Sequence, residues 1–547
     1  MKGRARRRAV TAPSRRAVPW KILLAAACLV VYGQTVGFGF VRADDTDLIL
    51  ANQAFLADLA NAPRAFSQHY FAVEGQPVGR GEYYRPLVVL SFMLDAQIGG
   101  TLPWGYHATN VVLHIVAVLL FFRWLRALGV GPRIAGFGAL VFAVHPLTTS
   151  AVAWIVGRND VLLAVLAFGA MLALVRWLEA GARGVPWAHL TWFGLALLTK
   201  EPAVLLPALA WLYTWAWADR PRALLRPSIL GAYVAVVGIW VVLRHAALGA
   251  SAPPAGAGRL GVTVLENLAG TLTYFGKAWL PVDLGVMPSP TRVGLVTGAL
   301  ALAALAALLL ADTGVRRKIV FGLCWCLALL APGLLVPDLP AYEHRAYLPL
   351  TGLIVSVAAA WAPAGPRPWA SWAAAAVAIV FGAITATYAR DFADPFTYWR
   401  SATTGTTYAP RAYVNLGKMF EEQGNLERAA AEYRAALDID PSALRANGSL
   451  GIVLMKLGRT EDAGLHFARE VALHPEDAEA HYNVGVFRKL QGRSAEAIAA
   501  WEEALDRDPG FVPAYGQLIE AYRLQGRTGD AGDLERRRAE VPVTGRP

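Results

Sequence analysis

Long apolar stretches separated by short polar connections fill the chain from residue 20 to about residue 390. A membrane-spanning helix needs about 20 mostly apolar residues. Eleven candidate stretches of 14 or more residues predict a polytopic membrane domain over 20–392. They are 20–41, 105–127, 133–150, 159–178, 187–200, 202–218, 228–248, 293–311, 319–337, 346–363 and 369–389. The fifth and sixth meet at Lys200-Glu201-Pro202, which predicts either a tight hairpin or a broken helix.

The even-numbered connections between these stretches are rich in basic residues. When residues 1–19 are placed in the cytoplasm as a basic N-terminus, every even-numbered connection is cytoplasmic and positive, as the Lys/Arg bias of membrane proteins requires. The basic residues of these connections are Arg123, Arg126, Arg133, Arg176, Arg183, Arg220, Arg222, Arg226, Arg316, Arg317, Lys318 and Arg367. An odd number of spans places the C-terminal part outside the cytoplasm, and one miscounted helix would reverse that side.

The first stretch has two interpretations. Val41-Arg42-Ala43, just before Asp44, resembles a signal-peptidase site, so the stretch could be a cleaved signal. Its apolar part is longer than the usual signal core of about 7–15 residues, which favours a retained helix. Either way, Asp44 emerges on the outer side.

Composition agrees with a membrane protein. The 547 residues are 56% hydrophobic and 17% charged, whereas soluble domains are about 45–50% apolar and about 25% charged. The net charge of +11 gathers near the N-terminus and in the short connections rather than on one basic face with aromatic residues, which argues against a nucleic-acid partner. Cys28, Cys324 and Cys326 lie in apolar stretches and are interpreted as packing residues.

A second pattern begins near residue 410, after a linker at 393–409. Its period of 34 residues and its alternation of small and large side chains match tetratricopeptide repeats, each a helical hairpin that packs on the next. Three clear repeats are predicted at 410–443, 444–477 and 478–511, with a degenerate fourth at 512–545 inside a repeat domain over 410–547. Glu470 replaces a usual small residue and should weaken the second repeat. Such solenoids bind extended peptide and seldom carry out chemistry.

The long first outer loop, 42–104, opens with three carboxylates close to the membrane, Asp44, Asp45 and Asp47. They are interpreted either as a solvated acidic cap or as a general base or cation site. Burial at the lipid–water boundary would raise the pKa of such a carboxyl group.

Further polar residues occupy positions where polar groups are costly, on or near the outer side. They are Tyr84, Arg85, His107, Asn110, His114, His145, Arg158, Asp160, Lys200, Glu201, Glu343, Arg345 and Tyr347. Each has a plainer interpretation: Lys200 with Glu201, and Glu343 with Arg345, could be structural ion pairs. The stripe formed by His107, Asn110 and His114 fits interhelical hydrogen bonding better than metal binding, because no third ligand is spaced to complete a site. Together, carboxylates and guanidinium groups on one membrane face suit a reaction that releases a lipid-linked phosphate.

Several short runs, in this order and spacing, resemble the transmembrane and tetratricopeptide repeat O-mannosyltransferases. The runs are Tyr83-Tyr84-Arg85-Pro86-Leu87, Trp104-Gly105-Tyr106-His107, Phe142-Ala143-Val144-His145-Pro146, Gly157-Arg158-Asn159-Asp160, Lys200-Glu201 and Arg345-Ala346-Tyr347-Leu348-Pro349. The resemblance covers nearly the whole chain. It implies an all-α fold of the GT-C glycosyltransferase type with about eleven transmembrane helices, followed by a repeat solenoid.

The resemblance also implies a chemistry. The donor would be a polyprenyl-phosphate sugar, usually mannose, the acceptor a Ser/Thr hydroxyl of an exported protein, and no metal or other cofactor would be needed. The family's acidic pair maps onto Asp44 and Asp45. The chain carries only about four repeats where eukaryotic relatives carry many more, and its Arg/Ala/Gly-rich composition points to a bacterial version in the plasma membrane.

The leading hypothesis is therefore an inverting glycosyl transfer at the outer membrane face. Asp44 or Asp45 would deprotonate the acceptor, and Arg85, Arg158, Lys200 and Arg345 would hold the departing phosphate. The remaining pocket residues would be Asp47, Tyr84, His107, Asn110, His114, His145, Asp160, Glu201, Glu343 and Tyr347. Two alternatives stay open: a membrane-anchored scaffold without enzymatic activity, whose repeats gather an envelope complex, and a GT-C transferase that acts on a glycan or lipid.

Overall fold

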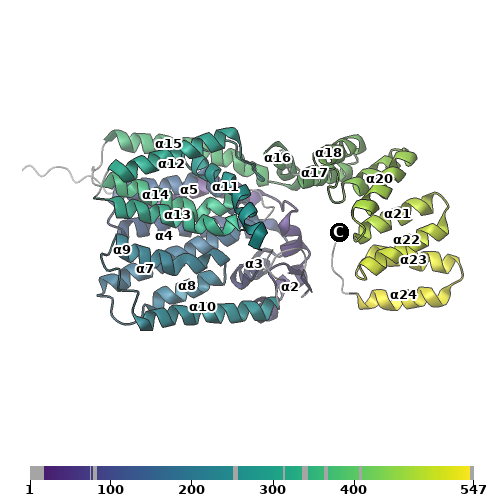
Figure 1. The fold of residues 1–547 in the computed structure, drawn as a ribbon, viewed down its shortest axis with the longest axis horizontal. Coiled ribbons are helices and arrows are strands. Elements are labelled where there is room, and N and C mark those ends of the chain that lie inside the picture. The colour runs from purple at the N-terminus through teal and green to yellow at the C-terminus, as the bar shows by residue number, and fades with distance from the viewer. Residues whose placement is uncertain are drawn as a thin grey trace, which may run out of the picture.

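The computed structural model describes residues 18–73, 76–77, 83–249, 257–311, 314–335, 343–362, 368–405 and 410–541. Most of the predicted basic N-terminus, Arg367 and the end of the fourth repeat lie outside these residues. The described chain forms a helical membrane part and a curved array of helical hairpins beside it (Figure 1). The predicted all-α class is confirmed, with one minor departure: β1 (Ala72–Val73) pairs antiparallel with β2 (Gln76–Pro77) in the first outer loop.

A helix overlaps each of the eleven predicted stretches, and several begin one to three residues before the predicted start. The helices are α1 (Trp20–Tyr32), α4 (Pro103–Ala127), α5 (Pro132–Val144), α7 (Arg158–Glu179), α8 (Trp187–Leu197), α9 (Leu206–Ala216), α10 (Pro227–Leu248), α12 (Arg292–Ala311), α13 (Arg316–Leu334), α14 (Tyr347–Trp361) and α15 (Pro368–Tyr388). By length and composition, seven helical segments of the described chain qualify as spans. An eighth qualifies if α5 and α6 (Thr149–Ala153), bent by 54° at His145-Pro146, count as one.

Five of these helices are shorter than a span requires. Helices α1 and α5 have 13 residues each, and each is followed by a further helical segment. Helices α8 and α9 have 11 residues each, and α14 has 15. Lys200 is extended (φ −161°, ψ 141°) and Pro202 follows in the short helix η6 (Glu201–Leu205), so the chain breaks where Lys200-Glu201-Pro202 predicted a break. Helix α8 packs on α7 and α10, whereas α9 packs on α13.

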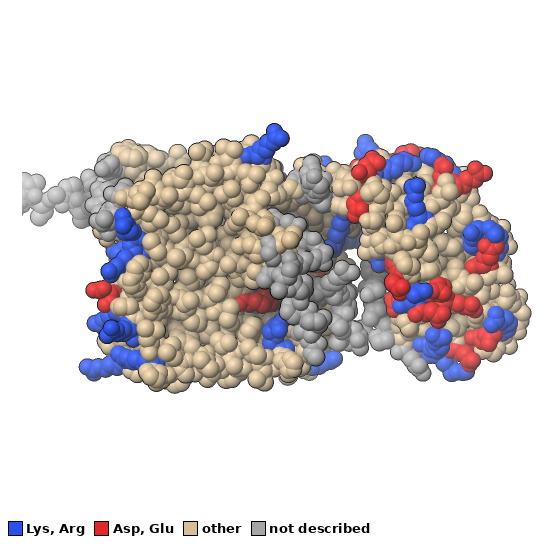
Figure 2. Space-filling model, in the orientation of Figure 1, with Lys and Arg blue, Asp and Glu red and all other residues tan. Residues whose placement is uncertain are grey.

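The basic connections meet at one end of the membrane part. Trp217 Nε1 donates to the Leu128 carbonyl at 3.0 Å, and an Arg226 guanidinium N–H donates to the Ala182 carbonyl at 2.7 Å. Arg317 pairs with Asp219 at 3.6 Å. Figure 2 shows Lys and Arg gathered at the end away from the repeats, next to a wide belt with few charges. Four of the even-numbered connections therefore lie at the same end of the membrane part, as the predicted topology requires.

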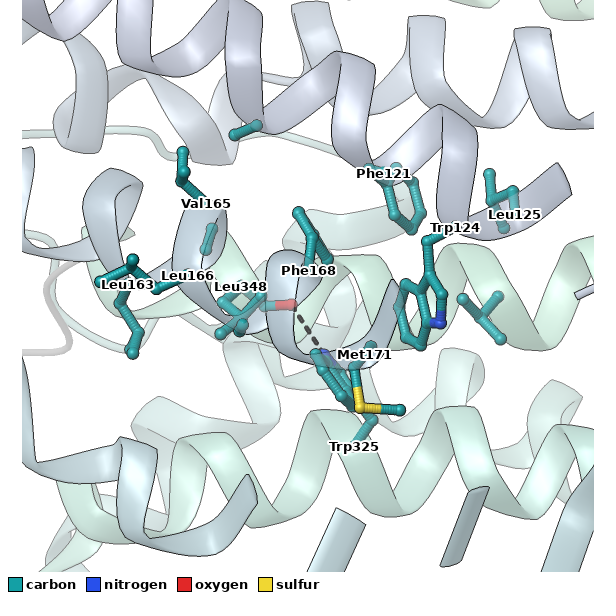
Figure 3. Packing of buried hydrophobic residues seen from close by; sticks show 14 of the residues in the cluster. Phe121, Trp124, Leu125, Leu163, Val165, Leu166, Phe168, Met171, Trp325 and Leu348 are labelled. Carbon is teal, nitrogen blue, oxygen red and sulfur yellow. Dashed lines mark hydrogen bonds between the residues drawn. The ribbon is translucent and has the colours of Figure 1, made fainter. Parts of the chain in front are cut away.

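Aromatic and aliphatic side chains fill the interior of the membrane part (Figure 3). Phe121 and Trp124 of α4 meet Phe168 of α7, with the Phe121 and Phe168 rings stacked at 5.3 Å. Trp325 of α13 packs on Trp124 at 5.0 Å between ring centroids, and its Nε1 donates to the Leu348 carbonyl at 3.2 Å. This hydrogen bond satisfies the indole N–H inside the apolar core and ties α13 to α14.

The end of the membrane part next to the repeats, called the outer end after the predicted orientation, carries shorter elements and one long helix that the apolar pattern did not predict. The short elements are η1 (Gly33–Gly37), η2 (Thr46–Leu50), α2 (Gln53–Ala57), η3 (Leu59–Phe66), α3 (Pro86–Gly99), η4 (Pro146–Thr148), η5 (Ile155–Gly157), η7 (Glu343–Ala346) and η9 (Ala389–Phe392). The longer helix is α11 (Ala257–Trp279), which packs on α12 and α13. It carries Glu266 and Lys277 and has no continuous apolar stretch, so a search for spans passes over it.

The repeats form the four predicted hairpins. They are α17 (Pro410–Glu422) with α18 (Leu426–Ile439), α19 (Ala446–Lys456) with α20 (Thr460–Leu473), α21 (Ala478–Leu490) with α22 (Ser494–Arg507), and α23 (Val512–Leu524) with α24 (Thr528–Glu540). In each of the first three, a glycine of one helix faces an aromatic ring of the other so closely that a Cβ would lie 2.3–2.8 Å from it. These pairs are Gly417 with Tyr433, Gly451 with Phe467, and Gly485 with Trp501.

The repeats are joined to the membrane part by packed structure. The predicted linker at 393–409 contains helix α16 (Pro395–Gly405), which packs on η9 and α17. The rings of Phe396 in α16 and Phe420 in α17 meet at 5.2 Å, in a hydrophobic cluster that also contains Val41 and Ile49 of the first outer loop. The first repeat is thus packed against the loop that begins with Asp44.

Candidate functional site at the outer end

The neighbouring carboxylates Asp44 and Asp45 have different surroundings. Both oxygens of Asp45 accept backbone N–H bonds, from Val41 at 2.7 Å and from Ala43 at 2.8 Å. Its side chain is buried, which raises the pKa of Asp45 to about 6 against the opposing effect of these two hydrogen bonds. Asp45 therefore holds the turn, in which Arg42 adopts a φ of 52°.

Asp44 is half-buried and makes no hydrogen bond or ion pair with any residue in the described ranges. Burial raises the pKa of Asp44, and the charge of Asp47 raises it too, whereas the guanidinium groups of Arg411 and Arg85 lower it. Arg411 belongs to the first repeat, and Arg85 immediately precedes α3 within the first outer loop. Of the two neighbouring carboxylates, Asp44 is therefore the one whose oxygens have no hydrogen-bond partner among the described residues.

Arg85 is fixed by partners on two sides. Its guanidinium pairs with Glu201 at 2.9 Å and lies over the rings of Tyr83, at 4.5 Å, and Tyr70, at 5.2 Å. The ion pair joins the first outer loop to the break between α8 and α9. Guanidinium groups stack on aromatic faces in this way while keeping N–H groups free for an anion.

Two further cations lie near Arg85. Lys200 donates to both oxygens of Asp160 at 2.7 Å and to Asn159 Oδ1 at 3.0 Å. Asp160 interacts electrostatically with Arg85, Lys200 and Arg345, and His344 interacts with the same three cations. The structure therefore brings four predicted residues, Arg85, Asp160, Lys200 and Arg345, together at the outer end.

Arg158 differs from the predicted phosphate ligands. Its side chain is fully buried, pairs with Asp95 at 2.5 Å and lies over the Phe92 ring at 4.7 Å. Its remaining N–H groups donate to Asn110 Oδ1 at 2.7 Å, to the Tyr106 carbonyl at 2.7 Å and to Ser91 Oγ at 3.2 Å. Because each of the three guanidinium nitrogens has a partner inside the protein and the side chain is fully buried, this geometry favours a structural role for Arg158 over phosphate binding.

The predicted pocket histidines are also held in the interior. His114 contacts the Tyr347 hydroxyl at 2.7 Å and the Ala143 carbonyl at 3.0 Å, so Tyr347 is engaged there as well. His145 contacts the Ala278 carbonyl at 3.1 Å, and His107 contacts the Gly39 carbonyl at 3.3 Å. These contacts agree with the simpler interpretation of the histidine stripe as interhelical hydrogen bonding.

The remaining predicted residues hold outer segments together. The Tyr84 hydroxyl donates to the Phe66 carbonyl at 3.0 Å, and Asn110 also donates to three carbonyls at the α6–α7 junction, the nearest at 3.1 Å. Glu343 pairs with Lys277 of α11 at 2.7 Å rather than with Arg345, so the predicted Glu343–Arg345 pair is replaced by a longer-range one.

Several residues of this region, His344 among them, were not predicted as site residues. Three of them lie beside predicted residues: Tyr70, Asp95 and Asn159. Two others come from α11 and from the first repeat, namely Lys277 and Arg411. Asn159 lies in the run Gly157-Arg158-Asn159-Asp160, so the sequence could have indicated it as a site residue. Tyr70 and Arg411 reach the site only through the folding of the outer loop and the docking of the repeats.

Helical spans and a docked hairpin array define an integral membrane protein with C-terminal tetratricopeptide repeats. Two family descriptions match these repeats: "Tetratricopeptide repeat" at 449–510 and 491–540, and "TPR repeat" at 417–458. The chain is similar to Protein O-mannosyl-transferase Tmtc2 of Drosophila melanogaster, with 38% identity over 32% of this chain and 19% of that protein. It is also similar to TMTC2 of Mus musculus, with 33% identity over 35% of this chain and 23% of that protein.

These matches confirm the resemblance predicted from the sequence: the chain has homologues named protein O-mannosyl-transferases, and its own C-terminal part carries tetratricopeptide repeats. In these matches the chain spans about a fifth of the length of its curated relatives. Among solved structures, "Crystal structure of MamA" matches 27% of this chain and 86% of that chain at 22% identity, with a TM-score of 0.24, which is too low to carry an argument.

Proposed function

We propose that the chain is a membrane glycosyltransferase that moves a sugar, mannose in the first instance, from a polyprenyl-phosphate donor to a Ser/Thr hydroxyl of an exported protein. The relatives' names support mannosyl transfer to protein. The observation that carries the proposal for this chain is the placement of Asp44, which has no hydrogen-bond partner among the described residues, within electrostatic range of Arg85 at the end that bears the repeats.

The transfer follows from these groups. Asp44 accepts the proton of the acceptor hydroxyl, and the oxygen attacks the anomeric carbon of the donor from the side opposite the phosphate. The bond between that carbon and the phosphate oxygen breaks, and the phosphate leaves with the electron pair. Arg85 and Arg345, with Lys200 beside them, stabilise the negative charge that develops on the phosphate oxygens. Attack from the opposite side inverts the anomeric configuration.

The charged phosphate and the long isoprenoid chain of the donor determine its position relative to the membrane in this proposal. Its phosphate sits at the outer end of the spans and its isoprenoid chain lies in the bilayer. With the basic connections in the cytoplasm of a plasma membrane, Asp44 and the repeats face outward. The acceptor polypeptide then approaches along the repeats, whose first hairpin packs on the Asp44 loop and supplies Arg411. No metal takes part, since carboxylate and guanidinium groups supply the base and the phosphate clamp.

The direct experiment uses the purified full chain with radiolabelled polyprenyl-phosphate mannose and a Ser/Thr-rich peptide. Transfer should occur with the wild type and fall by about 10²–10⁴-fold in Asp44→Asn, as expected for loss of a general base. Asp58→Asn is the matched control: Asp58 is an exposed carboxylate of the same loop, and its helix-capping role is one that Asn can take over. Full activity in Asp44→Asn, or labelling of lipid or glycan instead of peptide, would contradict the proposal.

A further inference from the structure

A cavity of about 450 Å³ lies between α4, α7 and α8, far from Asp44. It is formed near the end of α4, by the second half of α7 and by the start of α8, so it opens at the end where the basic connections meet. Its floor is apolar and includes Leu120, Leu172 and Ala173. The outer site makes no use of this cavity.

Two guanidinium groups border the cavity. Arg123 comes from α4 and Arg176 from the last turn of α7. Neither side chain forms an ion pair or a hydrogen bond with any residue that the structure describes, and both are exposed. The general bias toward positive cytoplasmic loops accounts for two arginines near this membrane face, but not for a shaped apolar cavity between them.

Three tryptophans complete the walls, as expected at the boundary between lipid and water. Trp177 Nε1 donates to the Arg183 carbonyl at 3.0 Å, which fixes its ring, and Trp187 is 67% exposed. Trp192 lies so close to α7 that a Cβ on Gly169 would be 2.7 Å from its ring. The absence of a side chain at Gly169 lets this indole form one wall of the cavity.

We propose that this cavity binds one anionic phospholipid of the adjoining leaflet. The lipid phosphate contacts Arg123 and Arg176, and an acyl chain lies along the apolar floor at Leu172 and Ala173. Phosphate accepts charge-assisted hydrogen bonds from guanidinium groups, and basic pockets between transmembrane helices suit anionic headgroups. A small soluble anion would satisfy the arginines but leave the apolar floor in contact with water.

The test is native mass spectrometry of the full chain with phosphatidylglycerol or phosphatidylcholine of matched acyl chains. The wild type should retain one phosphatidylglycerol with roughly tenfold higher affinity than phosphatidylcholine, about the effect of one charged hydrogen bond. Arg123→Gln/Arg176→Gln should remove this preference. Arg220→Gln/Arg222→Gln makes the same charge change at the same end without touching the cavity and should keep it.

Two further arms separate a lipid site from a simple anion site. Ala173→Phe fills the cavity without changing charge and should weaken phosphatidylglycerol binding. Inorganic phosphate at millimolar concentration should fail to displace the lipid. Equal binding of the two lipids by the wild type would overturn the proposal, as would a preference that persists in the Arg123/Arg176 variant or in Ala173→Phe, or displacement by inorganic phosphate. The wild-type comparison decides the question even if a variant does not fold.

Discussion

Arg158 and Asp95 form an ion pair of 2.5 Å in which both side chains are almost completely buried. The pair joins α3 of the first outer loop to the start of α7, and its neighbours Asn110 and Thr109 anchor it to α4. A buried pair of this kind is costly to break, because removing one partner leaves an uncompensated charge. It fixes the frame in which the outer loop presents Asp44.

We therefore expect Arg158→Met to lower the unfolding free energy by about 3–5 kcal/mol, the usual result of breaking a buried ion pair. The double variant Arg158→Met/Asp95→Leu should recover most of this loss, because no lone charge remains. Thermal unfolding in lipid nanodiscs measures both. A stable Arg158→Met protein that has lost only donor affinity would restore the phosphate-binding role predicted from the sequence.

Arg85 should behave differently, because its guanidinium is only partly engaged by Glu201 and stacks on two tyrosine rings. Arg85→Lys keeps the charge but loses the planar group that stacks and binds phosphate in two places. We expect transfer to fall by roughly 10–100-fold, corresponding to about 1.4–2.7 kcal/mol of transition-state stabilisation. Unfolding temperature should change little. Loss of folding without a specific loss of transfer would assign Arg85 a structural role.

The burial of Asp45 predicts that the free energy of unfolding depends on pH. Burial raises its pKa to about 6 in the folded protein from 3.8, so the folded state holds the proton more tightly than the unfolded state between these values. The stabilising contribution is therefore present below about pH 4 and is lost as the pH rises to about 6, amounting to about 3 kcal/mol. The difference in unfolding free energy between the wild type and Asp45→Asn, followed from pH 4 to pH 7, measures it. A flat difference would contradict the burial of Asp45.

For Glu470, the repeat pattern and the structure predict opposite effects of a substitution on the stability of the second repeat. The repeat pattern alone treats it as a misplaced residue whose replacement by Ala should stabilise the second repeat. In the structure its oxygens accept the backbone N–H groups of Arg445 at 2.7 Å and Gly448 at 2.9 Å, which caps the start of α19. Glu470→Ala should therefore destabilise this repeat by about 1–3 kcal/mol. Hydrogen exchange of α19 should quicken; slower exchange would favour the sequence interpretation.

The sequence predicted the elements whose signals are local. A helix overlaps each apolar stretch, and the 34-residue period located all four hairpins, because burial against lipid or against the next hairpin leaves a regular pattern in the sequence. Helix α11 was missed because its surface is amphipathic, with Lys277 reaching Glu343 across 66 residues of sequence. Helices α8 and α9 are short because the chain is broken at Lys200. Hydropathy indicates such a break but does not show how deep in the membrane it lies.

The candidate site was predictable as a set of residue types but not as a set of roles. Arg85 and Arg158 look alike in sequence, since each is a guanidinium at the start of an apolar helix. Only the fold shows that Arg158 has Asp95 as a buried partner while Arg85 faces the other cations. Likewise, only the fold distinguishes Asp44 from Asp45, because it shows that the carboxylate of Asp45 accepts hydrogen bonds from the backbone N–H groups of Val41 and Ala43.

The assignment of Asp44 as the base is tested most directly by separating donor binding from transfer in one variant. For Asp44→Asn, single-turnover transfer of labelled mannose should fall by about 10²–10⁴-fold, while the dissociation constant for the polyprenyl-phosphate donor should stay within about twofold of the wild type. Transfer at the wild-type rate, or an equal loss of donor binding and transfer, would show that Asp44 is not the group that takes the acceptor's proton.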